Sequence, residues 1–187
     1  MTDRLPLPPP DELSDAQRAA AERIASGPRG AIFGPFVPLL RSPELMTRLQ
    51  LVGEYLRWDS VLDDDLVELV ILHVARSWDQ DFEFGFHQPL ALAAGLPEDV
   101  VEAVARGSRP VGGRPEVGLV VQLLDELEDT RHVRDATYDA AVAVLGETKV
   151  VEVVGTAGYY TTLAMTMNVA RTPPPEGAPR LPVRDDA

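Results

Sequence analysis

The sequence predicts an all-α protein with a central antiparallel helix hairpin. Apolar residues recur with helical spacing over most of the chain, and the strict alternation typical of strands is hard to find. Residues that start or stop helices bracket the apolar segments. The length of 187 residues, with 45% hydrophobic residues, fits one domain with a substantial core.

The expected helices follow one another with short connections. Ser14 is a suitable N-cap for the first helix, and Pro43 after Ser42 marks the start of the second. The third helix opens with three aspartates and is apolar nearly all round, which predicts a central position. The expected helices span residues 14–26, 42–58, 63–78, 80–94, 95–107, 114–130, 134–146 and 147–172.

The remaining segments are rich in glycine or proline. Residues 27–42 contain too many glycines and prolines for regular structure, but the segment is too apolar to extend into solvent. We therefore expect it to lie across the surface or under a neighbouring subunit. Residues 1–13 and 172–187 are proline-rich arms around a single domain at 14–171, and we expect both arms to be extended and poorly ordered in a lone subunit. The polar N-terminus lacks the apolar core of a signal peptide, which predicts a cytoplasmic protein.

The composition argues against several classes of function. The net charge of −13 argues against nucleic acid or an anionic membrane as a partner. Because the chain has no cysteine, it has no disulfide, thiolate nucleophile or cysteine-based metal site. The apolar run 150–170 nearly reaches bilayer length, but Glu152, four threonines and Asn168 predict a buried helix or a subunit contact instead.

Three ionisable residues of the hairpin point to proton-transfer chemistry. Glu83 and His87 are four residues apart, so they share one helix face. Glu68 lies on the preceding, antiparallel helix, and all three stand among apolar residues. Two carboxyl groups and an imidazole gathered away from water have shifted, coupled pKa values suited to acid–base catalysis. Pro89 removes a helix hydrogen bond and predicts a kink near Gly85.

Two other interpretations compete with this one. Glu83 and His87 could be an ordinary exposed or satisfied pair without chemistry. A two-histidine, one-carboxylate metal site would need His73 as well, but His73 follows Glu68 by five residues, which turns it about 140° away on an ideal helix. We therefore expect no metal site, and we expect His132 to be a solvated residue at a helix end.

The hairpin resembles the carboxymuconolactone decarboxylase and alkyl hydroperoxide reductase D-like (AhpD-like) superfamily. Its peroxidase branch has a Glu, two Cys and a His at the spacing that Glu68, Gln80, Glu83 and His87 have here. The decarboxylase-like branch commonly has Glu at the second Cys position, and the final helix "VVEVVGTAGYYTTLAMTMNVA" is also similar to the superfamily. The resemblance covers roughly residues 30–172 and places the chain in the cysteine-free, decarboxylase-like branch.

The resemblance implies an AhpD-like helical fold, a homotrimer or homohexamer, and a small-molecule substrate. Without a thiol, peroxidase chemistry is disfavoured. A cofactor-independent lyase or isomerase acting on a small carboxylate or lactone is expected instead, with a non-catalytic binding or assembly protein on the same fold as the alternative. The expected catalytic groups are His87 as proton donor, Glu83 to orient it or share the proton, and Glu68 to set its charge. The expected substrate-binding residues are Arg76, Gln80, Tyr159, Tyr160 and Asn168.

Overall fold

The computed structural model describes residues 2–184; Met1 and residues 185–187, the outer ends of the two predicted arms, lie outside the described residues. The predicted all-α fold is confirmed, and the described part of the chain contains no β-strand. The helices are α1 (Asp15–Ala25), α2 (Phe36–Leu39), α3 (Pro43–Glu54), α4 (Asp64–Ser77), α5 (Asp81–Ala93), α6 (Glu98–Ala105), α7 (Pro115–Thr130) and α8 (Asp135–Ala170). Two short turns are η1 (Pro10–Glu12), which is 3-10 helical, and η2 (Tyr55–Asp59), which is π-helical.

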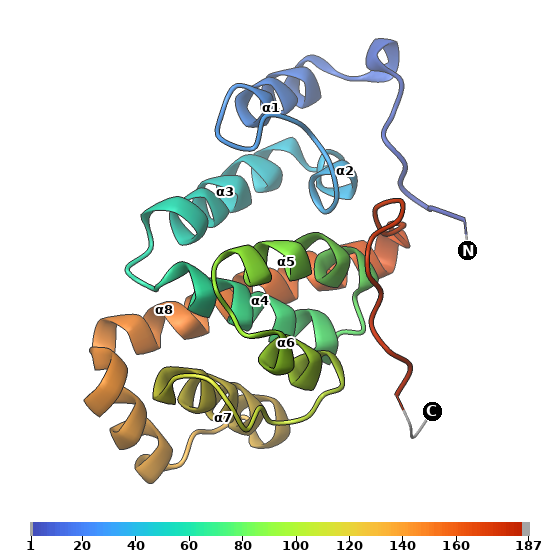
Figure 1. Cartoon of the computed structure of the whole chain (residues 1–187). Coiled ribbons are helices and arrows are strands. Elements are labelled where there is room, and N and C mark those ends of the chain that lie inside the picture. The colour runs from blue at the N-terminus through green and yellow to red at the C-terminus, as the bar shows by residue number, and fades with distance from the viewer. Residues whose placement is uncertain (1, 185–187) are drawn as a thin grey trace.

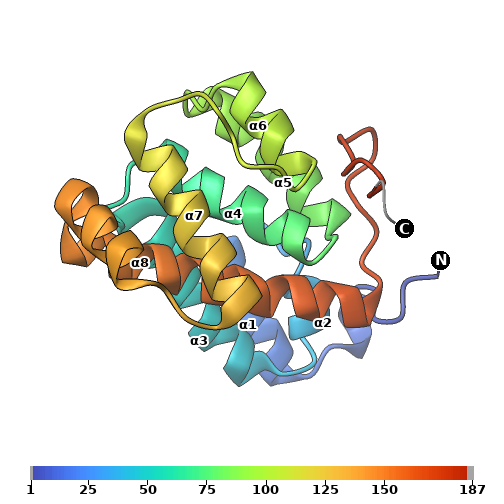
Figure 2. The same cartoon turned by 90° about the horizontal axis from the view of Figure 1, so that it is seen from below.

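The α4–α5 hairpin forms the centre of the molecule. Every residue of α4 from Leu66 to Arg76 is buried, which confirms the central helix predicted from its apolar surface. In Figure 1, α1, α2 and α3 lie on one side of the hairpin, α6 and α7 lie on the other, and α8 runs behind it. Figure 2 shows α7 beside α4 and α8, which are its packing partners.

Local signals place the helix ends close to where the sequence predicts them. Ser14 caps α1, because its hydroxyl accepts a hydrogen bond from the Gln17 backbone and the Gln17 side chain accepts one in return. The two predicted helices 134–146 and 147–172 form one element, α8, but Gly146 at φ 79° breaks its helical geometry. A bend therefore separates the two predicted segments, and it is visible in Figure 2.

The end of α3 differs from the prediction. The sequence predicts a regular helix up to Trp58, but the chain widens into the π-helical turn η2 after Glu54. Glu152 of α8 accepts hydrogen bonds from the Tyr55 hydroxyl at 2.5 Å, the Val61 backbone at 2.9 Å and the Ser60 hydroxyl. The single charged residue of the apolar run thus anchors η2 and the loop after it. Turns of this type are rare and occur often at functional sites.

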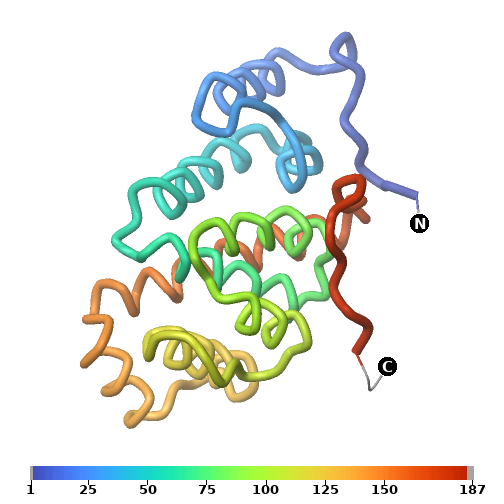
Figure 3. The backbone as a smooth tube through the Cα atoms, in the orientation of Figure 1, coloured from blue at the N-terminus to red at the C-terminus, as the bar shows by residue number. Residues whose placement is uncertain are grey.

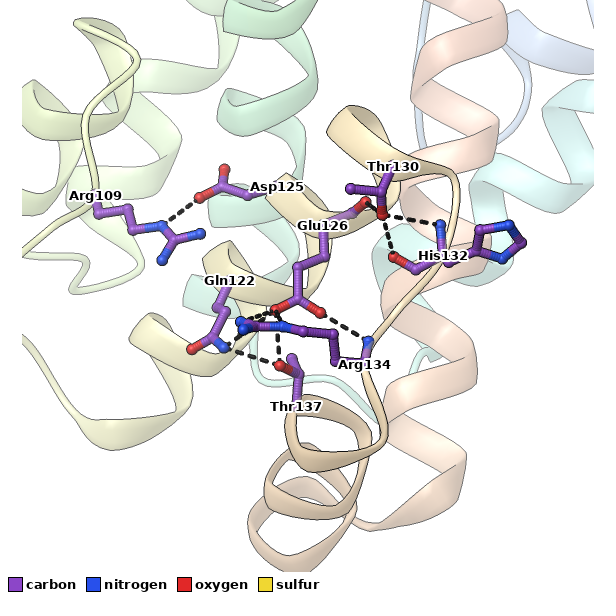
Figure 4. A network of polar contacts seen from close by, with 8 residues as sticks. All are labelled: Arg109, Gln122, Asp125, Glu126, Thr130, His132, Arg134 and Thr137. Carbon is purple, nitrogen blue, oxygen red and sulfur yellow. Dashed lines mark hydrogen bonds and ion pairs between the residues drawn. The ribbon is translucent and has the colours of Figure 1, made fainter.

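A second polar network joins the end of α7 to the start of α8 (Figure 4). Glu126 accepts hydrogen bonds from the Thr137 hydroxyl at 2.8 Å and the Arg134 backbone at 2.9 Å. The Arg134 guanidinium pairs with the same carboxylate. His132 is exposed in the connecting turn, as expected. The network fixes the hairpin that packs against α4.

In the described residues no helix is long and apolar enough to cross a membrane.

The C-terminal arm is extended but docked. Its described part runs down the side of the hairpin in Figure 3. The Leu181 backbone donates to Asp81 at 3.0 Å, and the buried Arg76 donates to the Pro182 carbonyl at 2.8 Å. The sequence predicted a poorly ordered arm. These polar partners at the hairpin turn could not be predicted, because they become neighbours of the arm only in the folded chain.

Gly85 makes room for this arm. A Cβ atom at Gly85 would lie 2.7 Å from the Pro179 carbonyl oxygen and 2.9 Å from Ala178 Cβ. Gly85→Ala is therefore expected to displace the arm while α5 persists, because Ala favours a helix by about 1 kcal/mol over Gly. Amide hydrogen exchange should show faster exchange at Leu181. Gly118→Ala is the matched control, because an added Cβ at this helical glycine would meet no atom within 4 Å outside its own stretch of helix. Equal exchange at Leu181 in wild type and Gly85→Ala would contradict this account.

Candidate active site

A small cavity lies between α5, the second part of α8, η2 and the segment before α2. Its volume of about 30 Å³ is enough for one or two water molecules. Glu83 and His87 reach it from α5, Tyr160 from α8 and Arg57 from η2. Phenylalanine side chains form much of the remaining wall, so the polar groups meet in apolar surroundings.

Glu68 and His87 form a buried hydrogen-bonded pair across the hairpin. Their Oε2 and Nδ1 atoms lie 2.7 Å apart, and the two residues are 6% and 5% exposed. The other Glu68 oxygen lies 3.6 Å from the Arg57 guanidinium. With Nδ1–H donating to the carboxylate, the lone pair of a neutral imidazole is on Nε2. Among residues 2–184, Nε2 has no hydrogen-bond partner, and the ring lines the cavity.

The surroundings of His87 keep its ring neutral. Burial lowers the pKa of His87, and the positive charges of Arg57 and Arg29 lower it further, against the opposing effect of the Glu68 hydrogen bond. The ring packs edge-on against Tyr160, with centroids 5.4 Å apart, and against Phe86. This packing fixes the ring plane, so Nε2 is a basic nitrogen held in one orientation.

Burial shifts the pKa of Glu83 in the opposite direction. Its side chain is 2% exposed, and its Oε2 atom is buried without a hydrogen-bond partner among the described residues. Burial raises the pKa of Glu83 well above its ordinary value of 4.5, which favours the neutral carboxylic acid. The structure thus shows Glu68, not Glu83, hydrogen-bonded to His87, which differs from the orienting role that the sequence predicted for Glu83.

This protonation state predicts a pH-dependent stability. Above pH 4.5 the unfolded chain loses the Glu83 proton while the folded chain keeps it, so the folded state binds one more proton. The free energy of unfolding then falls by about 1.4 kcal/mol per pH unit until the folded-state pKa is reached. Glu83→Gln removes this loss. Its free energy of unfolding relative to wild type, measured with urea, should therefore increase as the pH rises from about 5 towards the folded-state pKa. A difference that is constant over this range would mean that Glu83 is ionised in the folded protein.

The two tyrosines of α8 differ in position. Tyr160 lines the cavity, whereas Tyr159 is buried behind it and its hydroxyl has no hydrogen-bond partner among the described residues. Burial raises the pKa of Tyr159 to about 12 and also raises that of Tyr160. Both are therefore neutral phenols that can donate a hydrogen bond.

Like Tyr159, three other predicted binding residues do not line this cavity. Gln80 caps α5, where its amide donates to Asn168 at 2.7 Å and accepts from the Phe82 backbone. Asn168 donates in turn to the Trp78 carbonyl at 2.9 Å, so both side chains fasten the hairpin turn to α8. Arg76 pairs with Asp79 at 2.9 Å and holds the C-terminal arm.

His73 lies on another face of α4, as its spacing from Glu68 predicts. Its Nε2 is 2.9 Å from Asp125, and its Nδ1 is 3.5 Å from Glu128, both on α7. Burial alone would lower the pKa of His73, but hydrogen bonds with these two carboxylates raise it to about 9. His73 and His87 therefore share no site, and the described chain contains no cluster of three potential metal ligands.

Two arginines at the cavity were missed by sequence reasoning. Arg57 reaches it from η2, and Arg29 from the irregular segment between α1 and α2. Arg29 lies in a segment without helical spacing, and the π-helical turn places Arg57 differently from the regular helix that the sequence predicts up to Trp58. The combination of arginine, glycine and aromatic residues in 27–36 was a signal that could have drawn attention to Arg29.

The sequence of the hairpin also matches a known protein family. The model of the Carboxymuconolactone decarboxylase family matches residues 43–126, which include Glu68, Glu83 and His87. The predicted resemblance to this family is confirmed. The match covers the helices that form the hairpin, and the resemblance therefore rests on the part of the chain that carries the three ionisable groups. No curated protein matches the chain.

Solved structures share the fold at low sequence identity. A peroxidase-related protein from Ralstonia eutropha, described as an alkylhydroperoxidase AhpD core, has a TM-score of 0.75 at 14% identity, with 93% of each chain covered. A peroxidase-related protein from a Silicibacter species has a TM-score of 0.75 at 12% identity, covering 93% of this chain and 92% of the other. A putative antioxidant defence protein AhpD from Agrobacterium tumefaciens has a TM-score of 0.65 at 14% identity, covering 73% and 94%. The chain thus has an AhpD-like fold.

Proposed function

We propose that the protein is a cofactor-independent lyase or isomerase that transfers protons on a small carboxylate or lactone. The observation that carries this proposal is that one cavity is lined by a buried histidine and a buried carboxyl group, and burial lowers the pKa of His87 and raises that of Glu83. A base and an acid whose pKa values are shifted by burial are the groups that proton transfer to and from carbon requires.

Each of the three hairpin residues has a distinct role in this proposal. Glu68 holds the Nδ1–H of His87, which directs the basic Nε2 to the substrate. Glu83 donates a proton from its carboxyl group. The Tyr160 hydroxyl is available to stabilise an enolate oxygen, since the residue lines the same cavity.

These groups support two related reactions. In a decarboxylation, the bond between the substrate and its carboxylate breaks, carbon dioxide leaves, and the electron pair enters a conjugated carbonyl as an enolate. Glu83 then protonates carbon and regains its proton from water. In an isomerisation, His87 removes a proton from one carbon and Glu83 supplies one to another. Neither reaction needs a cofactor, because the substrate's own carbonyl accepts the charge. Thiol chemistry has no nucleophile here, since the chain has no cysteine.

Self-association into a trimer or hexamer, and a cytoplasmic location, are further parts of this proposal. Val151, Val154, Met165 and Val169 of α8 are each at least 45% exposed. Exposed apolar residues along a helix whose other residues are buried in the core support a contact with another subunit.

Proton transfer to carbon can be tested by exchange with solvent. γ-Carboxy-α,β-butenolide, an unsaturated lactone with a single carboxylate, is the first probe. In D₂O the wild-type protein should release carbon dioxide from it or place deuterium at a carbon next to its carbonyl, as followed by NMR. Absence of both, with this probe and with simpler unsaturated lactones, would favour the non-catalytic alternative.

A further inference from the structure

The partly buried guanidinium of Arg29 has no carboxylate partner among residues 2–184. Its Nε and Nη2 atoms are buried and have no hydrogen-bond partner among the described residues. The guanidinium lies over aromatic rings instead, 4.7 Å from the centroid of Phe36 and 5.3 Å from that of Trp58. Cation–π contacts stabilise the charge but leave the N–H donors unsatisfied.

A second unsatisfied donor lies beside Arg29. A Cβ atom placed on Gly53 would be 2.1 Å from the Tyr159 hydroxyl and 2.6 Å from Arg29 Nη2, so both groups lie against the same glycine. The Tyr159 hydroxyl has no hydrogen-bond partner among residues 2–184. Guanidinium and phenol donors that meet without an acceptor fit a carboxylate, which accepts several charge-assisted hydrogen bonds.

The charges around the cavity leave room for one negative charge. Arg29 and Arg57 contribute two positive charges, and Glu68 contributes one negative charge through its pairing with Arg57. Burial favours the neutral forms of both Glu83 and His87, because it raises the pKa of Glu83 and lowers that of His87. The sum is one uncompensated positive charge. A monoanionic ligand neutralises it, whereas a dianion would leave an excess negative charge in a buried site.

The backbone of the segment that carries Arg29 is hydrogen-bonded only locally. Residues 28–35 make backbone hydrogen bonds to Gly27 and to α2, and in the described chain none to α3, α5 or α8. Gly30 and Gly34 have positive φ angles of 72° and 55°, and they flank residues that line the cavity. Since the cavity holds only one or two waters, we expect this segment to be the wall that moves when a ligand enters.

From these contacts we propose that Arg29 and Tyr159 form the anion-binding end of the active site and hold the carboxylate of a monoanionic lactone or unsaturated acid. This inference rests on the proposed function, because it assigns the other end of the ligand to Glu83 and His87. Arg29 then takes the substrate-binding role that the sequence predicted for Arg76.

Binding of three related lactones tests the proposal by calorimetry. The probes are γ-butyrolactone, which is neutral, γ-carboxy-γ-butyrolactone, which is a monoanion, and isocitrate lactone, which is a dianion. Wild type should bind the monoanion at least about tenfold more tightly than the other two. Arg29→Gln should weaken monoanion binding about 10- to 100-fold and leave neutral lactone binding unchanged. Arg29→Lys should retain part of the affinity. Arg23→Gln, at an exposed arginine of α1, is the control and should bind as wild type.

Several outcomes would overturn the proposal: no preference of wild type for the monoanion, tighter binding of the dianion, or wild-type affinity in Arg29→Gln. If Arg29→Gln does not fold, Tyr159→Phe gives the second test, since it removes one donor and should weaken monoanion binding several-fold; unchanged affinity would count against the proposal. Arg29-dependent binding without deuterium incorporation would leave the anion site standing and refute the proposed function. Deuterium incorporation that is unaffected in Arg29→Gln would refute the anion site and leave the proposed function standing.

Discussion

Replacing His87 by Gln is expected to lower kcat by about 10²- to 10⁴-fold on any substrate that the wild-type protein turns over. Gln keeps a donor toward Glu68 but has no basic nitrogen, so proton abstraction is lost while the buried hydrogen bond can persist. Deuterium incorporation from D₂O is the measurement. Circular dichroism and thermal unfolding establish that the variant is folded.

His73→Gln is the matched control for this experiment. His73 is as buried as His87 but belongs to the α4–α7 contact with Asp125. Its replacement is expected to lower stability without a comparable loss of kcat. Full activity of His87→Gln would show that another group is the base, and equal losses in both variants would point to a structural effect.

Replacing Glu68 has the second largest expected effect. Glu68→Leu removes the acceptor that fixes the His87 tautomer and leaves Arg57 without its carboxylate partner. We expect kcat to fall by about 10²-fold or more, as for other carboxylates that orient a catalytic histidine. The free energy of unfolding is expected to fall by about 2 kcal/mol, less than for a fully buried pair, because the Arg57 side chain is 17% exposed.

A double variant separates the two effects of Glu68. Glu68→Leu combined with Arg57→Leu removes both charges, so the stability lost in the single variant should be largely regained. Activity should stay low, because His87 remains without its orienting partner. Recovery of kcat together with stability would mean that Glu68 acts by keeping the fold intact and not by orienting His87.

Much of the fold could be predicted because its signals are local. Ser14 and Pro43 mark helix starts, and the apolar surface of α4 requires a central position. The three hairpin residues converge because helical spacing places Glu83 and His87 on one face and the short turn folds Glu68 back toward it. Spacing also separated His73 from this site.

The binding residues were harder to predict, because their positions depend on contacts between distant segments. Arg76 follows Glu68 by eight residues, which rotates it by about 80° on an ideal helix, toward the C-terminal arm. Gln80 is close to Glu83 in sequence, but as the N-cap of α5 it turns back to the Phe82 backbone. Arg57 depends on a π-helical turn that no periodic pattern indicates. Arg29 lies in a segment without periodicity.

The protonation state of His87 tests the central claim most directly, and it needs no substrate. A long-range ¹H–¹⁵N correlation spectrum distinguishes the two ring nitrogens of each of the three histidines, and the His87 signals are assigned by their absence in His87→Gln. At pH 7 the account predicts a neutral ring with the proton on Nδ1, and protonation only below the ordinary pKa of 6.5. A proton on Nε2, or a charged ring at pH 7, would contradict the assignment of His87 as the base of this site.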